Sequence, residues 1–196
     1  MSSSPWRRRR FSTSGGDGRL IELVLTSCRF VQRAVGVDNS AAMLAMAEHR
    51  FQDEPRATFV NGDLRDDITG LGMFDVIVSG FAIHHLEHRR KRRLFAEISS
   101  ALSPAGVFLN LEVVQSASPS LHHQFLEAIG RTADDPEDRL ASVSDQLQWM
   151  TEAPLAEVDC HWKWRGFALL GGQATGKRPG RKLSRPLRQI LVRRSV

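Results

Sequence analysis

The chain of 196 residues contains no tyrosine, only two cysteines and no long hydrophobic run. Its longest nearly apolar stretch, Leu71 to Ile83, is interrupted by Asp75 and is too short to cross a bilayer, so no membrane partner is expected. Cys28 and Cys160 lie far apart and match neither a disulfide framework nor a metal-knuckle spacing. Because no apolar export signal follows the amino-terminal arginines, we expect a reduced, cytoplasmic protein.

Acidic residues are absent from both ends of the chain. Residues 1–10 and 171–196 carry twelve of the 27 Lys and Arg residues and none of the 22 Asp and Glu residues. Such a basic balance normally suggests a nucleic-acid partner, but here it describes two tails on an acidic domain, and RNA stays a minor alternative. We predict a basic, disordered segment over residues 1–13, a globular domain over residues 14–172 and a basic, disordered tail over residues 173–196.

Between the tails, short apolar runs alternate with helical patterns. This alternation, closed by two extended runs that a tight turn joins, predicts an α/β fold. We expect a Rossmann-like open, mostly parallel sheet with a carboxyl-terminal antiparallel hairpin. Strands are predicted at residues 34–38, 58–60, 74–81, 107–114, 158–164 and 167–170, and helices at residues 18–30, 40–51, 87–102, 121–129 and 143–150.

Ligands of such sheets bind at the carboxyl ends of the strands, and three features are expected there. The glycine-rich segment 15–18 opens a helix and lets a ligand approach the backbone closely, although such loops are common. Asp38 ends a strand, and its carboxylate can accept both hydroxyls of a ribose or cap the following helix. Asp63 can accept a hydrogen bond from an adenine amino group while Leu64 covers the ring, or it can form an ordinary Asp turn.

Together these segments resemble the class I S-adenosylmethionine-dependent methyltransferases. The resemblance extends from about Ser14 to Leu170 and is carried by AVGVDNSAAMLAMAE, TFVNGDL, FDVIVSGFAIHHL, LFAEISSALSPAGVFL and the closing hairpin. It implies S-adenosyl-L-methionine as the cofactor. It also implies a set of cofactor-binding residues, namely Gly16, Gly18, Asp38, Asn39, Met43, Asp63, Leu64, Ser79, Gly80 and Phe81.

The resemblance assigns each of these positions a role. Gly16 and Gly18 are expected to approach the methionine and ribose part, and Asp38 to hold the ribose. Asn39 and Met43 are expected to flank the adenosine. Asp63 and Leu64 are expected to bind the adenine, and residues 79–81 to face the reacting end.

The first strand departs from the family pattern, which has an apolar strand that ends in an acid before a glycine. The aligned stretch here is Arg9–Ser14, in which Ser12 replaces the acid and Ser14 replaces the first glycine. Burying unpaired arginines in a central strand costs several kcal/mol. We therefore expect the first strand to be degraded or missing. This leaves open a non-catalytic remnant with an impaired cofactor loop.

His84 and His85 follow the predicted strand at residues 74–81 and should lie near the site. A neutral imidazole can accept a proton near pH 7, so these two are the first choices for a catalytic general base. The alternative is a structural or pocket-lining role. No further ligands at a suitable spacing accompany them, so no metal site is predicted.

The predicted function is methyl transfer from S-adenosyl-L-methionine to an acceptor, taken by default as a small molecule. An NAD(P)-dependent oxidoreductase shares the glycine loop and the ribose acid. However, the segment 62–64 and the closing hairpin favour the methyltransferase. The absence of tyrosine also excludes a catalytic Tyr-Lys pair.

Overall fold

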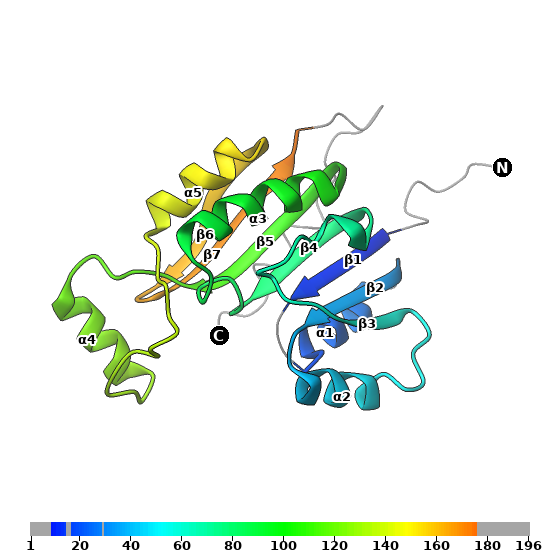
Figure 1. The fold of residues 1–196 in the computed structure, drawn as a ribbon, viewed down its shortest axis with the longest axis horizontal. Coiled ribbons are helices and arrows are strands. Elements are labelled where there is room, and N and C mark those ends of the chain that lie inside the picture. Colours follow the sequence, from blue (N-terminus) through cyan, green and yellow to red (C-terminus); the bar gives the residue numbers. More distant parts are fainter. Residues whose placement is uncertain (1–8, 15–16, 29, 176–196) are drawn as a thin grey trace.

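The computed structural model of the protein describes residues 9–14, 17–28 and 30–175. In this part of the chain, a seven-stranded sheet has the order β3-β2-β1-β4-β5-β7-β6 (Figure 1). Neighbours from β3 to β5 pair in parallel, and β7 runs antiparallel to both β5 and β6, which confirms the predicted α/β, Rossmann-like sheet with its closing hairpin. The strands are β1 (Arg9–Ser14), β2 (Val31–Asp38), β3 (Ala57–Asn61), β4 (Phe74–Gly80), β5 (Leu102–Val113), β6 (Leu155–Trp164) and β7 (Phe167–Ala174).

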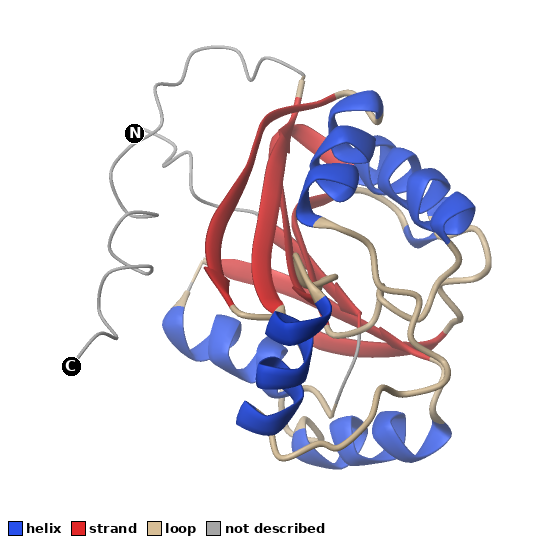
Figure 2. Cartoon of the chain, turned by 90° about the vertical axis from the view of Figure 1, so that its left-hand side faces the viewer, coloured by secondary structure: helices blue, strands red, loops and turns tan. Residues whose placement is uncertain are grey.

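Helices cover both faces of the sheet (Figure 2). Successive side chains of β2 point to opposite faces, so Ala34 packs in the core beside α1, while Val35 and Val37 pack in the larger core that α3 and α5 cover. The helices are α1 (Arg19–Ser27), α2 (Ala41–Arg50), α3 (His88–Ala101), α4 (Pro119–Ala128) and α5 (Val143–Glu152), with a 3-10 turn η1 (Thr69–Leu71) before β4.

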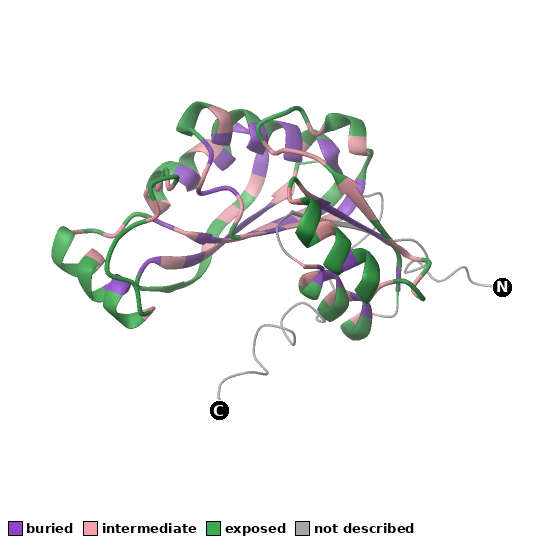
Figure 3. Ribbon diagram, turned by 60° about the horizontal axis from the view of Figure 1, so that its bottom comes forward, coloured by how far each residue is buried: buried purple, intermediate pink, exposed green. Residues whose placement is uncertain are grey.

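Buried positions gather on the sheet and on the inner sides of the helices, whereas most of α4 is exposed (Figure 3). In α3, the buried apolar residues Leu94, Phe95 and Ile98 follow the helical spacing that the sequence shows. Lys91 is an exception, because it is 1% exposed on the same helix. None of the helices in the described ranges combines the length and the apolar composition that a bilayer span requires.

The prediction that the first strand is degraded or missing is wrong. Arg9–Ser14 form β1 at the centre of the sheet, where Ser12 is paired with Val35 of β2 and Ile77 of β4. The reason is that a parallel ladder joins backbone groups, and two neighbouring strands offer partners on both edges of this segment. The sheet therefore begins inside the segment predicted as disordered, and β7 likewise continues to Ala174, beyond the predicted domain end. Residues 1–8 lie outside the described residues.

An ion pair at the edge of the sheet gives a prediction about pH. Arg56 donates to Glu54 through Nε (2.8 Å) and to the carbonyl oxygen of Val31 through Nη1 (3.2 Å). The hydrogen bond from Arg56 lowers the pKa of Glu54 to about 2. Because this pKa lies below its unfolded-state value, the pair stabilises the fold above pH 4.5 and loses its contribution as the pH falls towards 2.

We therefore expect Arg56→Gln to lower the free energy of unfolding at pH 7 by about 1 kcal/mol, a small value because the side chains of Arg56 and Glu54 are 34% and 27% exposed. The difference from the unsubstituted protein should shrink as the pH is lowered through 4.5. Urea unfolding of both proteins at several pH values measures it. A difference that stays constant down to pH 3 would contradict the assigned pair.

Candidate functional site

The candidate site lies at the carboxyl ends of β1, β2, β3 and β4. The strand order reverses between β1 and β4, since β1 continues to β2 on one side and β4 to β5 on the other. Ser14 at the end of β1 pairs with Val37 and with Ser79, and Asp38 at the end of β2 pairs with Asn61. The last residues of these four strands therefore share one edge of the sheet, where ligands of open α/β sheets bind.

Gly18 precedes the first residue of α1 and has a left-handed backbone with φ of 84°. A Cβ there would lie 2.9 Å from Cε2 of Phe51, so the position favours glycine both for its conformation and for the space it needs. Next to it, the Asp17 carboxylate accepts from Arg50 of α2 at 3.0 Å, which joins the beginning of α1 to the end of α2. Gly16, the other predicted loop glycine, lies outside the described residues.

Asp38 is half-buried, and its Oδ1 accepts the backbone N–H of Ser40 at 2.8 Å. Ser40 in turn caps α2 by accepting the N–H of Met43. Asp38 therefore shapes the turn into α2 while its carboxylate stays at the strand end. The side chain of Met43 is 39% exposed on the first turn of the same helix.

Asn39 links the ends of β2 and β3, because its Nδ2 donates to Oδ2 of Asp63 at 3.3 Å. Oδ1 of Asp63 accepts the N–H of Arg65 at 2.8 Å, and the Arg65 guanidinium lies 3.2 Å from Oδ2. The bond from the Arg65 backbone, together with those from Asn39 and the guanidinium, lowers the pKa of Asp63 below its usual value. The structure thus brings together Asn39, which was expected to flank the adenosine, and Asp63, which was expected to bind the adenine. It also shows Asp63 in the Asp turn that was its alternative role.

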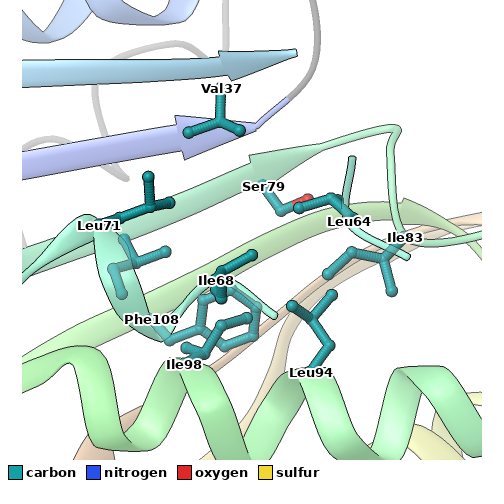
Figure 4. Close-up of a pocket in the computed structure, with 10 residues that line it drawn as sticks. Val37, Leu64, Ile68, Leu71, Ser79, Ile83, Leu94, Ile98 and Phe108 are labelled. Atoms are coloured by element: carbon teal, nitrogen blue, oxygen red, sulfur yellow. The ribbon is translucent and has the colours of Figure 1, made fainter. Parts of the chain in front are cut away.

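Leu64 is half-buried and lines a small apolar cavity between β4 and α3 (Figure 4). The cavity has a volume of about 30 Å³, which is room for only one or two water molecules. A nucleoside therefore cannot occupy this cavity, and a ligand would have to bind outside it, along the strand ends. The other lining residues are Val37, Ile68, Leu71, Ile77, Ser79, Ile83, Leu94, Ile98 and Phe108.

The end of β4 leads from a buried residue to an exposed aromatic ring. Ser79 is buried, and a Cβ added at Gly80 would have its nearest neighbour 4.0 Å away, on Leu20. Phe81 has a left-handed backbone with φ of 53°, and its ring is 45% exposed. This ring meets Phe167 edge-on at a centroid distance of 5.5 Å. The residues predicted to face the reacting end thus lead to an open aromatic surface.

His84 and His85 lie together, with ring centroids 3.9 Å apart. Nδ1 of His84 is 2.6 Å from Oε1 of Glu112, a β5 side chain that is 1% exposed. Oδ1 of Asp138, from the loop between α4 and α5, lies 3.5 Å from Nε2 of His84 and 3.4 Å from Nδ1 of His85. The two histidines therefore face two carboxylates that the sequence did not point to.

The segments that carry this cluster are hydrogen-bonded to each other. The carbonyl oxygen of His84 accepts the N–H of Arg139 at 2.9 Å and also accepts from Nζ of Lys91 at 3.3 Å. Nζ of Lys91 also donates to the carbonyl oxygen of Arg139. Burial lowers the pKa of Lys91 to about 8. These bonds hold the loop with Asp138 against the segment with His84.

Comparisons with known proteins give a consistent result. The sequence profile of a methyltransferase domain matches residues 13–106. A demethylmenaquinone methyltransferase of Leptospira interrogans is 31% identical over 103 residues, which are 50% of this chain and 41% of the relative. The chain therefore spans about two-fifths of the length of that curated relative.

Solved structures share the fold. The YcgJ protein from Bacillus subtilis has a TM-score of 0.61 and 25% identity, over 80% of this chain and 65% of its own. An O-methyltransferase family protein from Burkholderia thailandensis has a TM-score of 0.70 and 21% identity, over 88% of this chain and 52% of its own. The second likeness, at this identity, concerns the fold alone.

Proposed function

Since the chain belongs to the class I S-adenosylmethionine-dependent methyltransferases, we propose that it binds S-adenosyl-L-methionine and transfers the methyl group to a small-molecule acceptor. The observation that carries the proposal is the shared edge at the strand ends, where Asp38 lies beside the linked pair of Asn39 and Asp63. The amino terminus of α1 follows β1 at the same edge. This is the arrangement in which a nucleoside ligand can meet acids and backbone N–H groups together.

The residues present fit this cofactor. Gly18 keeps the amino end of α1 free of a side chain, and Asp38 offers a carboxylate to the ribose hydroxyls. Asp63 accepts three hydrogen bonds, one from Asn39 and two from Arg65, and a carboxylate has about four lone-pair sites, so capacity remains for an adenine amino group. S-adenosyl-L-methionine supplies a methyl group on a positively charged sulfur. Residues 79–81 would face that end, and Gly16 stays a predicted contact.

The acceptor is proposed to bind where Phe81 opens towards Phe167 and the histidine pair. Phe81 and Trp164 are 45% and 44% exposed, and Trp164 stacks on Phe167 at 6.2 Å, so the surface suits a flat organic molecule. His84 and His85 remain the predicted catalytic residues because they lie three and four residues after Phe81 in the chain. Positioning and the exclusion of water supply most of the rate in such a displacement.

The two alternative functions have less support. The remnant interpretation depended on a degraded first strand and an impaired cofactor loop. The strand β1 is present between β2 and β4, whereas residues 15–16 of the loop lie outside the described residues. The oxidoreductase interpretation depended on the glycine loop and Asp38 alone, whereas the matching family and the curated relatives are methyltransferases. The small-molecule acceptor, the minor RNA alternative and the cytoplasmic location stay predictions.

Calorimetric titration of the full chain with S-adenosylmethionine and with S-adenosylhomocysteine tests the proposal. We expect both to bind with micromolar dissociation constants. A chain that is folded by circular dichroism and binds neither compound would overturn the proposal in favour of the remnant. Tighter binding of NAD or NADP than of either compound would instead favour the oxidoreductase.

A further inference from the structure

The cluster of His84, His85 and Asp138 has the geometry of a ligand set rather than of a hydrogen-bonded group. Oδ1 of Asp138 is 3.5 Å from Nε2 of His84 and 3.4 Å from Nδ1 of His85, distances at which neither contact is a good hydrogen bond. One ligand atom from each of the three residues lies within 4.8 Å of the other two. Two of the side chains are about nine-tenths buried, since those of His84 and Asp138 are 9% and 10% exposed.

When the hydrogens are placed on the histidine rings of this cluster, several acceptor atoms face one another. Oε1 of Glu112 is an acceptor at 2.6 Å, so Nδ1 of His84 carries the hydrogen and Nε2 of the neutral ring has a lone pair. That lone pair faces Oδ1 of Asp138, which is buried and accepts no hydrogen bond. Nδ1 of His85 is also buried without a hydrogen-bond partner. With Nδ1 of His85 also unprotonated, three electron-pair donors lie around one point, an arrangement that a bound cation stabilises.

The distances suit a divalent transition-metal ion of the zinc type. Zinc binds histidine nitrogen and carboxylate oxygen at about 2.0–2.2 Å, which in a tetrahedron separates neighbouring ligand atoms by roughly 3.4 Å. The separations here are 3.4 and 3.5 Å. The bond from Nδ1 of His84 to Glu112 is also typical of metal sites, in which a carboxylate orients the histidine that binds the ion.

The charges and the backbone support the same site. Glu112 and Asp138 bring two negatively charged carboxylates, and Lys91 brings one positively charged ammonium group. A divalent ion together with an anionic acceptor oxygen would bring the net charge of the cluster to zero. The backbone bond from Arg139 to His84 holds the two ligand-bearing segments in place without the ion. The site is therefore preformed, which reduces the ordering that binding requires.

We propose that His84, His85 and Asp138 bind one divalent transition-metal ion at the acceptor end of the site. Three protein ligands leave a fourth position open, as in catalytic zinc sites. An acceptor hydroxyl oxygen can take that position, and this makes an oxygen-bearing small molecule the expected substrate class. The choice of substrate class rests on the proposed methyltransferase function, whereas the metal site does not. Sequence reasoning predicts no metal, because Asp138 is brought in only by the fold.

Metal content and metal titration of the full chain, purified without a histidine tag, test this site. After treatment with a chelator, we expect added Zn²⁺ to bind at one ion per chain. His85→Ala and Asp138→Asn should each weaken that binding by at least about 100-fold, and Glu112→Gln by about 10- to 100-fold. The matched control is His123→Ala, because His123 is 73% exposed on α4, where it pairs with the exposed Glu127.

Cobalt(II) provides a readout that needs no variant. Bound in place of zinc, it should give the intense visible absorption of a four-coordinate ion. Absence of stoichiometric binding would overturn the metal site, and so would binding that the His85 and Asp138 variants retain. Titration of the same preparation with S-adenosylhomocysteine separates the two proposals, because failure of the cofactor to bind contradicts the methyltransferase and leaves the metal result standing.

Discussion

Replacing Asp38 by alanine is expected to weaken the binding of S-adenosylhomocysteine by about 100-fold or more. Asp38 ends β2 beside the point where the strand order reverses, and its carboxylate is the group proposed to accept both ribose hydroxyls. A hydrogen bond to a charged group contributes about 1.5–3 kcal/mol, so the loss of two such bonds corresponds to at least that factor. Calorimetric titration of both proteins measures it.

Two control variants separate the ribose contact from other effects. Asp38 also accepts the N–H of Ser40 at the beginning of α2, and Asp38→Asn keeps an oxygen that can accept this bond. The asparagine variant should therefore fold as well as the unsubstituted protein and still bind weakly. Asp53→Asn removes an exposed negative charge beyond α2 and should leave binding unchanged. If Asp38→Asn binds as tightly as the unsubstituted protein, Asp38 does not hold the ribose.

Most of the helices and strands could be predicted from the hydrophobic periodicity of the sequence, because burial of one face of an element requires apolar residues at a regular spacing. The run predicted as a strand at residues 74–81 is β4 (Phe74–Gly80), and the helix predicted at residues 87–102 is α3 (His88–Ala101). The predicted hairpin is β6 and β7, which are longer than expected at their outer ends. The first and last residues of a helix or strand are harder to predict from a sequence, because an exposed backbone can extend a strand without an apolar side chain.

The first strand was the main element that side-chain patterns could not identify. Arginine and serine side chains lose their hydration when they are buried. A run of them therefore does not predict a central strand. The position of Arg9–Ser14 between two well-defined strands depends instead on backbone pairing with β2 and β4. Such pairing has no local signal in the sequence.

The residues at the sheet edge proposed for the cofactor could be named from the sequence, and those near the proposed acceptor only in part. Asp38 and Asp63 follow strands, so their places at the sheet edge could be inferred from the order of the elements. Glu112 has a weak signal, because it is an acid within the apolar run of β5. Asp138 has none, since it lies in an irregular loop that meets His84 only after folding. Residues on loops are predicted poorly for this reason.

The central place of β1 predicts a second large effect, on stability. Ser12 pairs with Val35 on one side and with Ile77 on the other. Proline removes the N–H from the ladder and is found almost only on edge strands, so Ser12→Pro should lower the free energy of unfolding by about 3 kcal/mol or more, enough to unfold a marginal domain. Ser12→Ala keeps the N–H and is expected to remain folded.

Urea unfolding of the two Ser12 variants therefore tests whether the arginine-bearing segment belongs to the sheet. Equal stability of the proline and alanine variants would show that β1 does not pair in solution. In that case the loop that follows β1 would lose its support, and binding of S-adenosylhomocysteine should fail in the unsubstituted chain as well. A destabilised proline variant beside a binding-competent alanine variant would instead establish that backbone pairing, rather than the character of the side chains, completes the nucleotide-binding edge of this sheet.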